Sequence, residues 1–153
     1  MQPAIQRRQD RALVFLTGCF DVFHHGHRIL LERAAKYGRV HVAIDSDALI
    51  RSAKGPDRPV DSWTKRCVNV KATNLVEAVY YLRDLEHLKW LIDRLKPDLM
   101  VKGNEDFSND PDKFIELIGG LDKVGGILLF PRTPDISTSQ LIEEGFTDGQ
   151  GKR

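Results

Sequence analysis

The sequence predicts a single-domain α/β fold of Rossmann-like type, in which helices cover both faces of a doubly wound, parallel, five-stranded sheet. Short apolar runs alternate along the chain with longer segments of helical periodicity. The runs are continuous rather than alternately polar and apolar, which is typical of strands buried on both faces. The chain has 153 residues, of which 41% are hydrophobic and 29% charged, and these values suit one soluble domain with one core.

Each apolar run is predicted to be a strand. The first, ALVFL, is rich in β-forming residues and ends shortly before a glycine, and the later runs have the same character. The expected strands cover residues 12–16, 40–44, 78–82, 99–101 and 127–130.

The segments between the strands are predicted to be helical, with one exception. Gly38 is expected to stop the first helix as its C′ residue, while Ser62 and Asp84 are expected to cap later ones. Segment 51–61 contains two prolines and a glycine and is predicted to be a loop. The expected helices cover residues 27–38, 63–74, 85–96, 114–118 and 137–144.

The domain is expected to cover residues 12–145, between a flexible N-terminal segment (1–11) and a flexible glycine-rich tail (146–153). We expect a cytoplasmic protein, because the sequence shows no signal-peptide pattern and no apolar run near the about 20 residues of a membrane span. The two cysteines lack the spacing of a zinc site and are expected to be reduced. A net charge of +1 without a basic stripe argues against nucleic-acid or membrane partners.

Three histidines surround one glycine where the first strand meets the first helix. Free backbone N–H groups and the positive end of a helix make such a junction an anion site. His24 and His27 are three residues apart, so both rings can face one phosphate, and Gly26 lets a ligand approach the backbone. Helix capping is the alternative role for these histidines. No metal ligand is predicted, because no Cys, Asp or Glu set with ligand spacing accompanies them.

The segment from Gly18 to His27 resembles the signature G-x-F-D-x-x-H-x-G-H of the cytidylyltransferase-like nucleotidyltransferases, with Cys19 at a variable place. It is similar to this segment in glycerol-3-phosphate cytidylyltransferases and heptose 1-phosphate adenylyltransferases. The resemblance implies that His24 and His27 hold a triphosphate and stabilise the transition state, and it implies nothing for His25.

Three later segments extend the resemblance over about residues 13–144. Residues 54–60 resemble the K-G-x-x-R-P-V loop of the heptose enzymes, where Lys54 would clamp phosphate, although an exposed surface lysine is the alternative. Residues 95–103 resemble their L-K-P-D-x-x-V-K-G segment, and residues 132–139 resemble the R-T-x-x-I-S-T-[ST] signature. The implied catalytic residues are His24, His27, Lys54 and Arg132. The implied nucleotide-binding residues are Thr17, Gly18, Cys19, Phe20, Gly26, Lys102, Gly103, Ile136, Ser137 and Thr138.

The resemblance implies that the phosphate of a sugar or polyol phosphate attacks the α-phosphorus of a nucleoside triphosphate, releasing pyrophosphate. Mg²⁺ would arrive with the triphosphate, positive groups would surround the phosphates, and the family implies a homodimer. Two segments favour ATP with a sugar 1-phosphate, and the third favours CTP with glycerol 3-phosphate.

Two departures from the family pattern leave a second hypothesis open. Thr64 stands where a glutamate usually lies two places before Arg66, and Asn104 and Glu105 replace a usual G-D pair. A regulatory module that binds nucleotide without turnover is therefore the alternative.

Overall fold

The computed structural model describes residues 11–103, 115, 116, 120 and 124–130, and it contains a parallel sheet. The strands lie side by side in the order β3-β2-β1-β4-β5, and each neighbouring pair is parallel. They are β1 (Leu13–Gly18), β2 (Arg39–Asp45), β3 (Ala78–Leu82), β4 (Leu99–Gly103) and β5 (Ile127–Phe130). The predicted parallel α/β architecture is confirmed.

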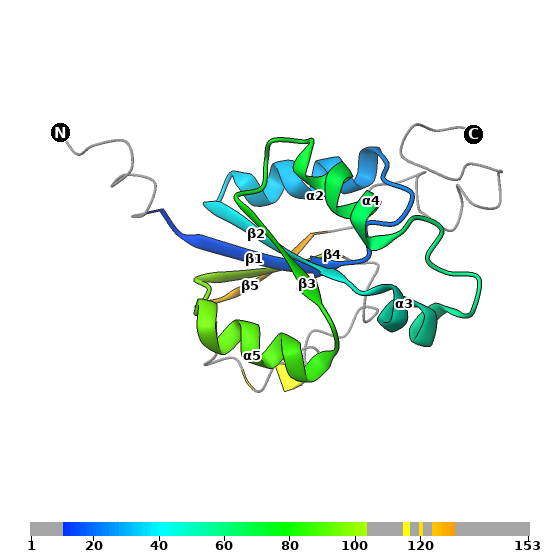
Figure 1. Cartoon of the computed structure of the whole chain (residues 1–153). Coiled ribbons are helices and arrows are strands. Elements are labelled where there is room, and N and C mark those ends of the chain that lie inside the picture. The colour runs from blue at the N-terminus through cyan, green and yellow to red at the C-terminus, as the bar shows by residue number, and fades with distance from the viewer. Residues whose placement is uncertain (1–10, 104–114, 117–119, 121–123, 131–153) are drawn as a thin grey trace.

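Helices lie on both faces of this sheet (Figure 1). Helices α2 (His25–Ala35) and α4 (Trp63–Lys71) cover one face, and α5 (Leu85–Leu95) covers the other. Alternate residues of β1 supply both cores: Leu16 packs in the first apolar cluster and Phe15 in the second. Both side chains are fully buried, which explains why this strand is continuously apolar.

The strand order places the topological switch point beside β1. The chain runs from β1 through β2 to β3 on one side and then crosses to β4 on the other. Open sheets of this kind bind ligands outside the carboxyl ends of the strands at this point. A ligand-binding site is therefore expected at the carboxyl ends of β1 and β4.

Two predicted helix caps are confirmed. The Ser62 hydroxyl accepts the Lys65 N–H at 3.3 Å, and the Asp84 carboxylate accepts the His87 N–H at 2.9 Å. Helix α4 ends at Lys71, three residues before the predicted end.

The prediction that segment 51–61 is entirely a loop is wrong for its first four residues, which belong to α3 (Asp47–Lys54). The Ser46 hydroxyl caps this helix by accepting the Leu49 N–H at 3.0 Å, and Ile50 is buried beneath it. The helix-breaking residues begin only at Gly55, whose φ of 109° ends the helix. The loop between α3 and α4 therefore covers residues 55–62 and is called the 55–62 loop below.

Gly38 has a different role from the predicted one. Helix α2 starts at His25 and is capped at its C-terminus by Lys36, which has helical dihedral angles. A Cβ atom on Gly38 would lie 2.1 Å from the Ala12 carbonyl oxygen, far inside van der Waals contact. Gly38 is therefore needed because the backbone before β1 passes against it.

Two predicted helices lie largely or wholly outside the described residues. Of the helix expected at 114–118, only residues 115 and 116 are described, and both are helical. The helix expected at 137–144 lies outside them. No helix in the described part of the chain has the length and apolar character to cross a membrane.

Candidate active site

His24 and His27 lie together at the start of α2, just after the carboxyl end of β1. Their rings are stacked, with centroids 3.9 Å apart. The Gly26 N–H donates to His24 Nδ1 at 3.0 Å, and the His24 N–H donates to His27 Nδ1 at 3.2 Å. These two bonds form a reciprocal capping box, so the helix-capping role is present.

The capping bonds determine which ring nitrogen carries the proton. Each Nδ1 accepts an N–H, so the proton of each neutral ring lies on Nε2. The Nε2–H of His24 is buried and has no hydrogen-bond partner among the described residues. A buried donor without a partner is costly, and a ligand acceptor would relieve that cost. Capping thus leaves the Nε2–H of His24 as the ring group that would meet a ligand.

Both histidines are neutral at pH 7. Burial, followed by the charge of His25, lowers the pKa of His24 from 6.5 to about 4. Burial, followed by the charges of His24 and Lys54, lowers the pKa of His27 well below 6.5. At pH 7 the two side chains are therefore neutral N–H donors.

Asp21 connects the turn before His24 to the 55–62 loop. It is 1% exposed, and its carboxylate accepts the N–H groups of Val60 at 2.8 Å and Asp61 at 2.9 Å. It also accepts the N–H of Val22 at 3.1 Å, and Arg58 Nε lies 3.5 Å from its Oδ2. One buried carboxylate thus holds two segments that are about 40 positions apart in the chain.

The backbone on both sides of Asp21 is strained. Phe20 has a φ of 53° and Val22 a φ of 47°, in the left-handed region that β-branched residues rarely adopt. Such residues persist where the surrounding contacts over-determine them, and they gather at functional sites. The bonds of Asp21 supply that constraint here.

Arg66 connects the carboxyl ends of β1 and β2 to the 55–62 loop. Its side chain is 0% exposed, and its Nη1 donates to the carbonyls of Cys19 and Asp45, each at 2.8 Å. Its Nε donates to the Asp61 carbonyl at 3.1 Å, and its Nη2 pairs with Asp47 at 2.6 Å.

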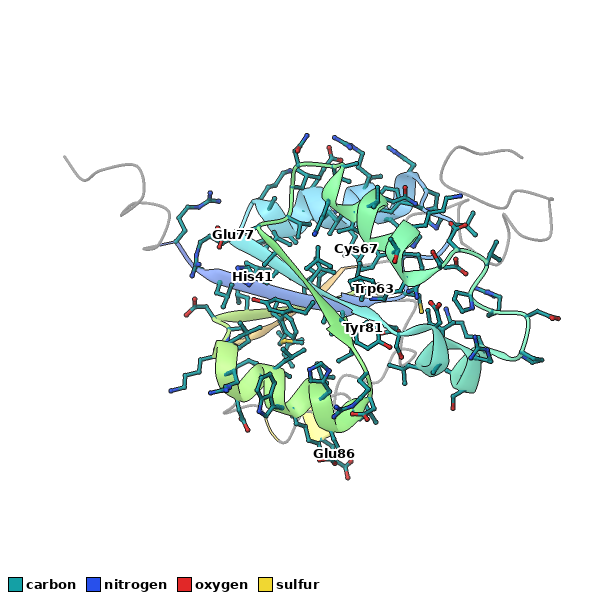
Figure 2. All side chains as sticks on the ribbon, viewed as in Figure 1. His41, Trp63, Cys67, Glu77, Tyr81 and Glu86 are labelled. Atoms are coloured by element: carbon teal, nitrogen blue, oxygen red, sulfur yellow. The ribbon has the colours of Figure 1, made fainter. Side chains whose placement is uncertain are left out.

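Helix α4 presents Arg66 to these groups because it is anchored on the sheet. Trp63 Nε1 donates to the Ile44 carbonyl at 3.0 Å, and the Trp63 ring packs edge-on against Tyr81, with centroids 5.4 Å apart (Figure 2). Buried Cys67 lies on the inner side of the same helix (Figure 2).

The structure brings most of the described predicted site residues to one edge of the sheet. Thr17 and Gly18 end β1, Cys19 and Phe20 follow it, and Gly26 lies in the first turn of α2. Lys102 and Gly103 end β4, the strand beside β1 at the switch point. Lys54 ends α3 rather than lying in a loop, and its charge contributes to lowering the pKa of His27. Arg132, Ile136, Ser137 and Thr138 lie outside the described residues.

Two residues of this region were not predicted as site residues, namely Asp21 and Arg58. Both belong to quoted family patterns, Asp21 to the histidine signature and Arg58 to the 54–60 segment. Their mutual contact depends on the packing of two distant loops, so position in the sequence did not disclose it. Among the described residues, no group of three His, Cys, Asp or Glu side chains is placed to hold a metal ion.

Comparison with known proteins identifies the family. The cytidylyltransferase-like family pattern matches residues 15–144. Bifunctional protein HldE of Koribacter versatilis (strain Ellin345) is 35% identical over 144 residues, which cover 91% of this chain and 28% of that protein. Bifunctional protein HldE of Campylobacter jejuni subsp. doylei is 36% identical over 139 residues, covering 90% and 28%. The chain therefore spans little more than a quarter of the length of these relatives.

Solved structures share the fold. The lipopolysaccharide core biosynthesis protein of Thermoplasma volcanium superposes with a TM-score of 0.69 at 22% identity, over 80% of this chain and 98% of that one. Pantothenate synthetase of Thermus thermophilus superposes with a TM-score of 0.56 at 12% identity, over 95% and 63%. The family match over most of the chain, together with this fold, shows that the chain belongs to the cytidylyltransferase-like family of nucleotidyltransferases.

Proposed function

We propose that this chain transfers a nucleoside monophosphate from a nucleoside triphosphate to the phosphate of a sugar or polyol phosphate and releases pyrophosphate. The observation that carries the proposal is the Nε2–H of His24 beside the switch point of the sheet, which is buried and has no hydrogen-bond partner among the residues that the structure describes. The resemblance of residues 54–60 and 95–103 to segments of heptose 1-phosphate adenylyltransferases, together with the similarity to proteins named HldE, supports a sugar phosphate as acceptor.

The proposed reaction is a direct in-line displacement. An oxygen of the acceptor's phosphate attacks the α-phosphorus, and the bond from that phosphorus to the bridging oxygen breaks as pyrophosphate leaves. A phosphate monoester is already a nucleophile, so no protein nucleophile is required. The protein's part is to orient both reactants and to stabilise the charge that develops on the phosphoryl oxygens.

His24 and His27 would act as fixed donors to these oxygens. Their capping bonds hold the rings in place before the substrate arrives, so little reorganisation is needed during the reaction. The charge of a bound triphosphate would raise the pKa of both rings and favour protonation as negative charge develops. Lys54, Arg132 and Lys102 would add positive charge around the phosphates.

Mg²⁺ would be carried by the triphosphate and held by its oxygens and by water, neutralising their charge. The described residues around the histidines do not form a metal site. The buried carboxylate of Asp21, three residues before His24 in the chain, already accepts three backbone N–H groups.

The choice of triphosphate follows from the sequence segments. Residues 54–60 and 95–103 favour ATP with a sugar 1-phosphate, and residues 132–139 favour CTP with glycerol 3-phosphate. We propose ATP as the preferred donor and CTP as the alternative. A non-catalytic regulatory module is the alternative of another class, and a homodimer remains a prediction from the family.

The test is pyrophosphate release by the purified chain with Mg²⁺, crossing ATP, CTP, GTP and UTP with sugar 1-phosphates and glycerol 3-phosphate. We expect release that requires one triphosphate and one acceptor. Nucleotide binding without release for any pair would contradict turnover and favour the regulatory alternative.

His24→Asn provides a matched variant for this assay. An asparagine side chain can accept the Gly26 N–H and so preserve the cap, but it removes the Nε2–H donor. We expect turnover to fall by about 100-fold or more, as when one transition-state donor is lost, while Tm stays close to the wild-type value. Wild-type turnover in this variant would refute a catalytic role for His24.

A further inference from the structure

We infer that Arg58 binds the phosphate of the acceptor substrate, using the Nε–Nη2 edge of its guanidinium group. This inference rests on the proposed function and adds a substrate-binding residue to it. Three observations support it. They are the contacts of Asp21, the nitrogens of Arg58 that lack partners among the described residues, and the side of the sheet from which the 55–62 loop approaches.

Asp21 holds Arg58 in place without occupying its donors. Three backbone N–H groups already bond to the two Asp21 oxygens, namely those of Val22 and Asp61 to Oδ1 and that of Val60 to Oδ2. Arg58 Nε lies 3.5 Å from Oδ2, which is close enough for ion pairing but makes no hydrogen bond. The carboxylate therefore balances the charge of the guanidinium and leaves its N–H groups available.

The unpaired nitrogens of Arg58 form one recognition edge. Nε and Nη2 are buried and have no hydrogen-bond partner within the part of the chain that the structure describes. Their N–H bonds lie on the same side of the planar group and run parallel, which matches two oxygens of a phosphate. A buried edge of this kind is costly when empty and is satisfied by a bidentate anion.

A second donor, on His24, has the same property. The Nε2–H of His24 is also buried and has no partner in the described part of the chain, and Asp21 precedes His24 by three residues. Arg58 and His24 thus each have buried donors that lack acceptors among the described residues. An arriving pair of phosphate groups would supply both.

The direction from which Arg58 approaches identifies the acceptor rather than the nucleotide. The switch point, where a nucleotide is expected, lies between β1 and β4. Arg58 belongs to the 55–62 loop, which follows β2 and α3 on the other side of β1. An in-line attack requires the acceptor's attacking oxygen to lie opposite the departing pyrophosphate at the α-phosphorus, so an acceptor that enters from the β2 side needs its phosphate held on that side.

The test compares Arg58→Gln, Arg58→Lys and the control Arg51→Gln in the full chain. Arg51 is an exposed arginine of α3, so its substitution removes the same charge nearby without touching the Asp21 contacts. Arg58→Lys keeps a charge beside Asp21 and is expected to fold, but it lacks the parallel N–H pair. Acceptor KM, triphosphate KM, kcat and Tm are measured for each protein, and inorganic phosphate binding is measured by calorimetry.

We expect both Arg58 variants to raise acceptor KM by about 30-fold or more, the size expected when a buried charge-assisted hydrogen-bond pair loses one member. Triphosphate KM should stay within about twofold of wild type, as should all values for Arg51→Gln. Equal increases in both KM values with a lowered Tm, or wild-type kinetics in both Arg58 variants, would overturn the inference.

If the wild-type chain releases no pyrophosphate, the proposed function fails separately, and the calorimetry still decides on Arg58. Inorganic phosphate should then bind the wild type and Arg51→Gln alike and bind Arg58→Lys more weakly. Equal phosphate affinity in all three proteins, or no binding to any, would overturn the inference.

Discussion

Replacing Arg66 with methionine tests whether one buried side chain organises the candidate site. The side chain is 0% exposed and donates to the carbonyls of Cys19, Asp45 and Asp61 at 2.8, 2.8 and 3.1 Å. Methionine has a similar apolar stem but no donor. The substitution therefore leaves three carbonyl oxygens without their donor while removing little packing.

The expected loss of stability follows from these bonds. A hydrogen bond from a charged donor contributes about 1.5–3 kcal/mol, and breaking a buried charged arrangement by removing one member costs about 3–5 kcal/mol. The Asp47 side chain is 41% exposed, so water can replace its contact at small cost. We therefore expect a loss of about 4 kcal/mol, equivalent to a fall in Tm of about 8–16 °C for a domain of this size.

Urea unfolding followed by the fluorescence of Trp63 and Trp90 measures this loss. Arg51→Met is the control, because an exposed arginine on the surface of α3 should change stability by no more than about 0.5 kcal/mol. A loss below about 1 kcal/mol for Arg66→Met would refute the reasoning, since it would mean that the three carbonyls do not depend on Arg66.

Two further perturbations test the packing and the histidine environment. Gly38→Ala should lower the free energy of unfolding by about 1–3 kcal/mol, because the added Cβ would lie 2.1 Å from the Ala12 carbonyl oxygen. A thermal melt measures this loss, and an unchanged Tm would contradict the close approach. Stability should decline as the pH falls from 6.5 towards 4, because in that range the unfolded chain binds a proton at His24 that the folded protein, with its lowered pKa, does not. Urea midpoints should fall less steeply with pH in His24→Asn, and equal slopes in both proteins would show that His24 does not contribute.

The pattern of the chain was sufficient to predict the sheet. Buried parallel strands must be apolar on both faces, and this requirement is visible in runs such as the one that forms β1. The histidine signature was predictable for a similar reason. A helix that begins directly after a strand at the switch point places its first residues at the ligand edge, whatever the remaining packing does.

Sequence reasoning was less successful where the role of a residue depends on a distant partner. Gly38 was assigned to a helix end, but its actual constraint is the backbone before β1. The prolines and glycine of segment 51–61 predict a loop at Lys54, whereas the Ser46 cap and buried Ile50 favour helix up to that residue. For Gly38 a contact made elsewhere in the fold decides the role, whereas both ends of α3 are set by local features, the Ser46 cap and Gly55.

The sequence by itself determined the α/β architecture and the location of the histidine pair, because hydrophobic periodicity and the strand–helix junction are local properties. Only the tertiary structure decided the protonation of those histidines, the link from Asp21 to the 55–62 loop and the edge of Arg58 that has no partner among the described residues. How deeply a side chain is buried, and which of its hydrogen-bonding groups have partners, depends on groups from β1, β2, the 55–62 loop and α4. These segments are distant in the sequence and meet only when the chain folds.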